Sequence, residues 1–121
     1  MWLVSKQFRF EASHKLPYHS GKCARLHGHS WIGHIVCASN ELSKAGSDRG
    51  MVTDYEDMNR AVLPLLDNTL DHWHLNDSTG LDNPTSEELA RWIYNQLKPS
   101  LPLLTSVVIE ETCTTRCEYH P

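Results

Sequence analysis

The sequence contains no apolar run that approaches the roughly 20 residues needed by a membrane-spanning helix. Its first residues also lack the basic-then-apolar order of a secretory signal peptide. Internal repeats and low-complexity tracts are missing as well. We therefore expect a soluble, cytoplasmic protein.

An excess of positive charge is also missing. The chain has 11 Lys and Arg against 15 Asp and Glu, and its formal net charge is −4 with histidine neutral. Such a charge balance argues against binding to nucleic acid or to an anionic membrane surface. Basic residues still gather locally, because Lys15, Lys22 and Arg25 lie close together in the sequence.

Cysteines are few, and the chain does not need them as cross-links. With 121 residues, 40% of them apolar, it can bury a core as one domain over 1–121 without disulfides. We therefore expect reduced thiols. Cys37 lies among apolar strand residues and is interpreted as a small core side chain. The C-x3-C spacing of Cys113 and Cys117 suggests a second metal site only weakly, because no further ligands lie near it.

What the sequence does contain is a group of histidines near a thiol. His14 is followed by Cys23 and then by His27 and His29, which are separated by one glycine. Residues two apart on a strand point to the same face, so His27 and His29 can offer two imidazoles to one ion. Three nitrogen ligands with a vacant fourth position are typical of catalytic zinc. The competing interpretation is ordinary surface or core histidines, and spacing leaves Cys23 open as a ligand or as a base beside the metal.

Four strands are predicted. Alternating apolar residues indicate the first over 2–12, and β-branched and aromatic residues indicate the second over 29–38. The loop over 13–28 would then carry the histidines. Further strands are expected over 105–112 and 117–120.

Two helices are predicted between these pairs of strands. Asp54 is a suitable N-cap for the first helix, which Pro64 should kink or interrupt. Thr85 and Glu88 form a capping box for the second, which ends before Pro99. The order ββααββ favours an α+β fold, an antiparallel four-stranded sheet with two helices on one face. Its exposed edges favour an oligomer built through its strands.

Acidic residues add two candidate functional positions. Asp71 and His72 are adjacent, so the carboxylate could orient the imidazole as an acid–base relay, although neighbouring side chains normally diverge. Glu111 shares a strand face with Val107 and Ile109. A carboxylate there suits the paired N–H donors of a pterin or guanine, and the alternative is a solvated strand end.

Together these segments resemble the 6-pyruvoyl-tetrahydropterin synthase family, and within it the QueD-type 6-carboxytetrahydropterin synthases. Only three residues separate Cys23 from the His-Gly-His segment, as in the QueD branch. The matching segments extend over nearly the whole chain: Phe10-Glu11-Ala12-Ser13-His14, Cys23 to His29, Gly50 to Tyr55, Leu70-Asp71-His72, Leu75-Asn76, Asn83-Pro84-Thr85-Ser86-Glu87 and Glu111-Thr112.

The resemblance implies a T-fold that assembles as an oligomeric barrel, a hexamer of two stacked trimers with active sites between subunits. It also implies site residues. Zinc ligands would be His14, His27 and His29; catalytic residues would be Cys23, Asp71, His72 and Glu111; and the pterin pocket would be lined by Thr85, Ser86 and Glu111.

The implied reaction converts 7,8-dihydroneopterin triphosphate to 6-carboxy-5,6,7,8-tetrahydropterin, acetaldehyde and triphosphate, with the product used in queuosine biosynthesis. Zinc would act as a Lewis acid and Cys23 as a base. The alternatives are the pyruvoyl-forming synthase on the same fold and a non-catalytic zinc- or pterin-binding module. Trp31, His34 and Arg116 have no assigned role.

Overall fold

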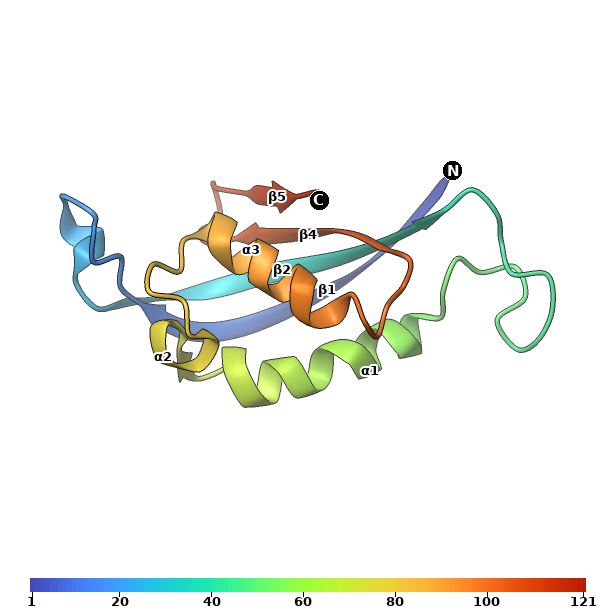
Figure 1. Ribbon diagram of the computed structural model, residues 1–121, viewed down its shortest axis with the longest axis horizontal. Coiled ribbons are helices and arrows are strands. Elements are labelled where there is room, and N and C mark those ends of the chain that lie inside the picture. Colours follow the sequence, from blue (N-terminus) through green and yellow to red (C-terminus); the bar gives the residue numbers. More distant parts are fainter.

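The computed structural model describes residues 1–121 as a five-stranded sheet with helices packed on one face (Figure 1). The strands are β1 (Trp2–His14), β2 (His27–Ser39), β3 (Trp73–His74), β4 (Leu104–Glu110) and β5 (Cys117–Tyr119). The helices are α1 (Tyr55–Leu65), α2 (Leu75–Thr79) and α3 (Ser86–Leu97), with a 3-10 turn at Lys22–Ala24 and a π-helical turn at Leu66–Leu70. None of the helices has the length and apolar character needed to cross a membrane.

The sheet is mixed, so the predicted purely antiparallel four-stranded sheet is wrong in this respect. Its strand order is β3-β1-β2-β4-β5, and only β3 runs parallel to its neighbour, β1. This strand has two residues, Trp73 and His74, which pair with Ala12 and Ser13. Two residues are too few to produce an alternating pattern, and this is why the sequence did not reveal β3.

Both long strands extend further than predicted. Their antiparallel pairing continues to the pair formed by His14 and His27. His14 and His27 therefore lie inside β1 and β2, and the prediction that the loop over 13–28 carries them is wrong, whereas His29 lies in the second strand as predicted. The pairing holds the three imidazoles on a rigid ribbon, a firmer support than a loop.

Alternation along β1 sets which face is buried. Phe8, Phe10, Ala12 and His14 are buried beneath the helices, whereas the residues between them are exposed or half-buried. Trp31 lies opposite Phe10 and stacks on its ring with centroids 5.7 Å apart. The apolar core thus continues along this face up to the histidines.

Close packing also requires a glycine in the middle of the ribbon. Gly33 pairs with Phe8, whose ring lies over it. A Cβ atom at position 33 would come within 2.2 Å of that ring. No side chain can therefore replace the hydrogen of Gly33 unless Phe8 moves.

The helices begin as predicted. The Asp54 carboxylate accepts the N–H of Glu56 at the start of α1, and the Thr85 hydroxyl accepts the N–H of Glu88 at the start of α3. Pro64 lies within α1 and does not end it. The chain instead widens into the π-helical turn that follows, and the short α2 is an element that the sequence did not predict.

Candidate metal centre

Three imidazoles and one carboxylate converge at one end of the helix-covered face. One ligand atom from each of His14, His27, His29 and Glu111 lies within 4.8 Å of the others. The histidines come from β1 and β2, and Glu111 follows the last residue of β4 on the same face as Ile109. The structure thus brings the three predicted metal ligands together and adds Glu111 to them.

Backbone carbonyls orient two of the rings. Nδ1 of His14 lies 2.8 Å from the carbonyl oxygen of Pro84, and Nδ1 of His27 lies 2.7 Å from that of Arg25. Each Nδ1 must therefore carry the proton that it donates, which leaves Nε2 with a free lone pair. A hydrogen bond from the other ring nitrogen to a carbonyl oxygen is usual for metal-binding histidines.

Buried nitrogen atoms at the centre of the group have no hydrogen-bond partner. Both Nε2 of His14 and Nε2 of His29 are buried and unsatisfied. Burial also lowers the pKa of both imidazoles, which favours the neutral form that binds metals. Unsatisfied buried polar atoms call for a missing partner, and a divalent cation fits this nitrogen-rich donor set.

Trp31 packs beside these rings, although no role for it could be assigned from the sequence. Its indole centroid lies 5.0 Å from that of His14 and 5.2 Å from that of His29, with the rings edge to face. Its N–H donates to the carbonyl of Ala12, so the indole itself is fixed. The histidines of this group are therefore held by packing as well as by hydrogen bonds.

Asp71 and His72 contact each other despite being adjacent in sequence. His72 has a φ of 66°, a left-handed conformation that turns its ring back to the carboxylate, and its Nδ1 lies 3.0 Å from Oδ2 of Asp71. The other carboxylate oxygen accepts the N–H of Glu11, and this bond above all holds the pKa of Asp71 below its usual range. The pair thus forms on the edge of β1, with the His72 side chain 78% exposed and outside the metal-ligand group.

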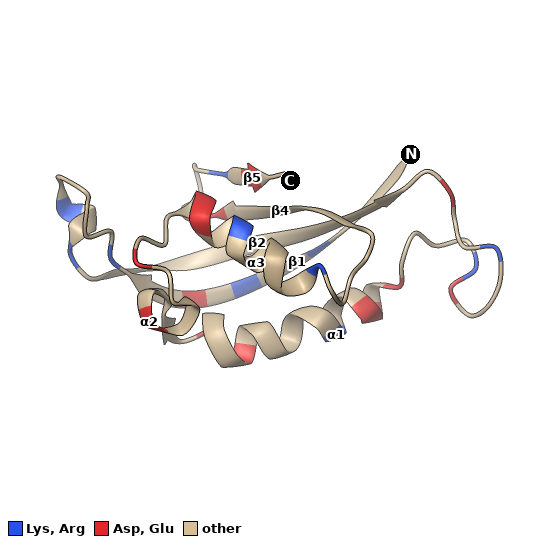
Figure 2. Cartoon of the chain, in the orientation of Figure 1, with Lys and Arg blue, Asp and Glu red and all other residues tan.

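Cys23 lies in the 3-10 turn of the β1–β2 loop and is half-buried. It is not among the four grouped ligands. The same loop carries the basic residues predicted near the histidines, seen in blue at the tip of the long ribbon in Figure 2. All four cysteines of the chain are free thiols, and Cys37 is fully buried as predicted.

Asn76 is a positioning residue that sequence reasoning missed. Its side chain accepts the N–H of Lys15 at 3.0 Å and donates to the carbonyls of Lys15 and Asp82. Lys15 directly follows His14, so Asn76 ties the start of the β1–β2 loop to α2. Its only signal in the sequence was its place in the Leu75-Asn76 segment of the family resemblance.

Thr85 and Ser86 lie at the start of α3, close to the metal group. A hollow of about 270 Å³ is lined by these two residues together with Glu111 and Arg116. Pro84, which holds the ring of His14, directly precedes them. The structure thus brings the predicted pocket-lining residues to the metal group.

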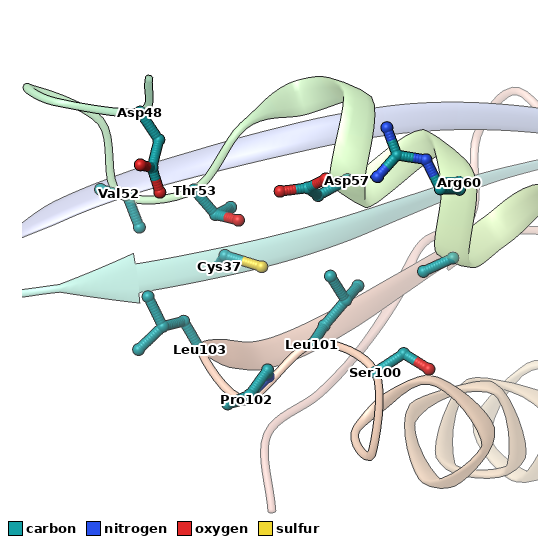
Figure 3. Close-up of a pocket in the computed structure, with 11 residues that line it drawn as sticks. Cys37, Asp48, Val52, Thr53, Asp57, Arg60, Ser100, Leu101, Pro102 and Leu103 are labelled. Carbon is teal, nitrogen blue, oxygen red and sulfur yellow. Dashed lines mark hydrogen bonds and ion pairs between the residues drawn. The ribbon is translucent and has the colours of Figure 1, made fainter. Parts of the chain in front are cut away.

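The largest of the described hollows lies elsewhere. Figure 3 shows it between the far end of β2, α1 and the segment before β4, with Cys37 on its floor and Asp57 and Arg60 on its rim. Its volume is about 520 Å³. Arg60 and Asp57, two of its charged residues, form an ion pair at 2.6 Å. This hollow contains none of the predicted site residues.

Comparison with solved structures shows the fold. The 6-pyruvoyl tetrahydropterin synthase of Caenorhabditis elegans superposes with a TM-score of 0.85 at 24% sequence identity, covering 99% of this chain and 95% of the other. That of Plasmodium falciparum superposes with a TM-score of 0.71 at 16% identity, covering 99% and 97%. The chain therefore has the T-fold of these proteins.

Comparison with sequences shows the family. A relative from Synechocystis sp. named 6-carboxy-5,6,7,8-tetrahydropterin synthase is 49% identical over 120 residues, covering 98% of this chain and 93% of the relative. One of the same name from Haemophilus influenzae is 33% identical over 140 residues, covering 98% and 99%. The family model described as 6-pyruvoyl tetrahydropterin synthase matches residues 3–121. This chain therefore belongs to the 6-pyruvoyl tetrahydropterin synthase family.

Proposed function

We propose that this chain is a zinc-dependent lyase that converts 7,8-dihydroneopterin triphosphate and water to 6-carboxy-5,6,7,8-tetrahydropterin, acetaldehyde and triphosphate. The carrying observation is the group of His14, His27 and His29 beside Glu111, in which Nε2 of His14 and Nε2 of His29 are buried without a hydrogen-bond partner. Family membership and the 49% identical relative of that name support this reaction. The product would serve queuosine biosynthesis, as the resemblance implies.

The three histidines would hold the zinc ion through Nε2, because the Nδ1 atoms of His14 and His27 face backbone carbonyls. When bound, zinc supplies a Lewis acid that polarises the side-chain oxygens of the substrate and makes the neighbouring C–H groups more acidic. The neutral, desolvated imidazoles of His14 and His29 suit this role, since protons do not compete for their nitrogen atoms.

Two groups of the chain would move protons. Cys23, which stands outside the grouped ligands, would take a proton from the substrate as a base. His72 would transfer a proton on the other face, with Asp71 fixing its tautomer through the 3.0 Å contact at Nδ1. Asp71 can do so because the Glu11 N–H stabilises its ionised form.

The pterin would lie in the hollow beside the start of α3. Glu111 would accept the two parallel N–H donors of the pterin ring, while Thr85 and Ser86 line the walls. The triphosphate would meet the basic residues of the β1–β2 loop, among them Lys22 and Arg25.

A hexamer of two stacked trimers would complete the site. The outer edge of β5 and most of β1 have no partner strand in the chain, since β3 covers β1 only at Ala12 and Ser13. Edges of this length are usually paired or protected. The exposed His72 would then serve the metal centre of a neighbouring subunit. Light scattering coupled to size exclusion would test the assembly, with a monomer as the contradicting result.

Acetaldehyde release tests the reaction. Zinc-loaded protein is incubated with 7,8-dihydroneopterin triphosphate, and acetaldehyde is followed by coupled reduction while the pterin products are separated by chromatography. Stoichiometric acetaldehyde and 6-carboxytetrahydropterin are expected. A 6-pyruvoyl product without acetaldehyde would assign the pyruvoyl-forming activity instead. Unchanged substrate would favour a non-catalytic binding module.

A further inference from the structure

The contact between Glu111 and the histidines is not a hydrogen bond. Oε1 of Glu111 lies 3.2 Å from Nε2 of His14 and 3.3 Å from Nε2 of His29. Neither nitrogen has a hydrogen-bond partner, and His14 places its proton on the opposite nitrogen, towards Pro84. A lone pair of His14 therefore faces a carboxylate oxygen. Two acceptors at this distance repel each other unless a cation lies between them.

The two distances match those of metal ligands that share one ion. Zinc binds imidazole nitrogen at about 2.0–2.1 Å and carboxylate oxygen at about 2.0–2.2 Å, so neighbouring ligand atoms of a tetrahedral site lie about 3.3 Å apart. The observed contacts fit this spacing for two of the three histidines. Glu111 therefore occupies the position of a fourth ligand.

A four-ligand site is closed, whereas a catalytic zinc site keeps one position for substrate. Glu111 would need both of its oxygen atoms for the two pterin N–H donors, so it cannot bind the metal and the pterin at the same time. Building on the function proposed above, we propose that Glu111 is the fourth metal ligand of the substrate-free protein and leaves the metal when a pterin binds. The pterin ring would thus open the coordination position that its own side chain needs.

The position of Glu111 permits this movement. It lies just beyond the last residue of β4, and its side chain is 27% exposed. Glu111 lines two hollows, and the one of about 270 Å³ is also lined by Thr85 and Ser86. Side-chain rotation alone can carry the carboxylate from the histidines towards that hollow, without a change in the sheet.

Zinc affinity provides the first test, measured by competition with a chromophoric chelator. Glu111→Gln should weaken zinc binding at least about tenfold. This is the smallest loss of metal affinity that usually follows when a hydrogen-bond partner of a metal ligand is removed. Glu110→Gln is the matched control, because Glu110 points to the opposite face of the sheet and pairs with His34 at 2.9 Å. It should stay within about twofold of wild type. Equal affinities for Glu111→Gln and Glu110→Gln would overturn the proposal.

A second test needs no variant. Unsubstituted pterin has the ring donors but no side chain to fill the opened position, so it should compete with zinc for Glu111. By linkage, it should bind the zinc-loaded protein more weakly than the metal-free protein, and by the same factor by which it weakens zinc binding. Calorimetric titration with and without zinc measures this factor. Equal pterin affinities in the two forms would overturn the proposal.

These outcomes separate the inference from the function on which it rests. Unchanged zinc affinity in Glu111→Gln, together with acetaldehyde release by wild type, would overturn only the role of Glu111 as a ligand. Wild-type protein that binds no zinc would overturn both. Far-ultraviolet circular dichroism of each variant identifies unfolding, and the pterin–zinc linkage of wild type decides the question if Glu111→Gln does not fold.

Discussion

The two ends of the helix-covered face of the sheet differ in how their polar groups are satisfied. At the far end, the larger hollow contains a buried thiol and the paired charges of Arg60 and Asp57 (Figure 3). At the metal end the hollows are smaller, and buried nitrogen atoms of His14 and His29 have no hydrogen-bond partner. The only other unsatisfied buried side-chain atom belongs to Asn83, next to the Pro84 carbonyl that orients His14. Unsatisfied polar groups, more than volume, therefore mark the chemical site.

Removing a ligand should produce the largest difference between the two ends. His14→Ala should reduce bound zinc well below one ion per chain, because it removes the one fully buried imidazole of the ligand group. Elemental analysis after zinc loading and gel filtration measures the ratio. His34→Ala is the control, since His34 lies on the opposite face of β2 against Glu110, and it should keep its zinc. Full zinc content in His14→Ala would remove the basis of the comparison.

The second-largest difference should lie in how the thiols of the two ends, Cys23 and Cys37, affect the rate of turnover. Cys23→Ala should slow acetaldehyde release about 10²–10⁴-fold, the usual contribution of a general base, while zinc content is unchanged. Cys37→Ala, at the far end, should keep the wild-type rate. Loss of zinc from Cys23→Ala would mean that Cys23 is a ligand, and a similar loss of rate in Cys37→Ala would give the far hollow a part in turnover.

Alkaline pH should lower the stability that the buried thiol of the far end, Cys37, contributes. Burial raises the pKa of Cys37 to about 11, from an ordinary value of 9.0. As pH rises above about 9, the unfolded chain loses this proton first, so the contribution of the thiol to stability, complete below that pH, declines towards pH 11. At pH 10.5 about 2 kcal/mol of the free energy of unfolding should be lost, at 1.36 kcal/mol per pKa unit.

Urea unfolding of wild type and Cys37→Ala at pH 8 and pH 10.5 isolates this contribution, because titrations elsewhere affect both proteins. The advantage of wild type over the variant should shrink by about 2 kcal/mol at the higher pH. A constant difference would show that Cys37 does not titrate in this range.

The smallest effect should come from the rim of the far hollow. Arg60→Ala removes an ion pair whose side chains are 74% and 53% exposed, so the free energy of unfolding should fall by no more than about 0.5 kcal/mol. Acetaldehyde release should remain at the wild-type rate. Thermal unfolding and the same kinetic assay measure both, and slower turnover would show that the larger hollow contributes to the reaction.

The metal group could be predicted because its geometry follows from strand periodicity. Residues two apart share a face, which placed His27 with His29 and Glu111 with Ile109. His14 joined them because antiparallel pairing sets it opposite His27. The helix starts at Asp54 and Thr85 were equally local, since each cap is made by one side chain and an N–H two or three residues later.

Other features depend on contacts that no local pattern records. β3 exists because its two residues reach the distant edge of β1. The contact of Asp71 with His72 requires a positive φ that a histidine rarely adopts. The bonds of Asn76 to Lys15 join segments 61 positions apart in the sequence. The place of Glu111 among the ligands likewise needed coordinates, because face alternation gives direction but not distance.

The packing of Phe8 over Gly33 has a consequence for which length changes β2 can tolerate. It fixes how the two strands align, and His29 lies four positions from Gly33 along the same strand. Deleting or inserting one residue between them would turn both His27 and His29 to the opposite face, away from His14. We therefore expect natural length variation to be confined to the β1–β2 loop, which ends before His27, and to the segment after Ser39. Gly33, which has no chemical role, thus determines where this chain can accept insertions.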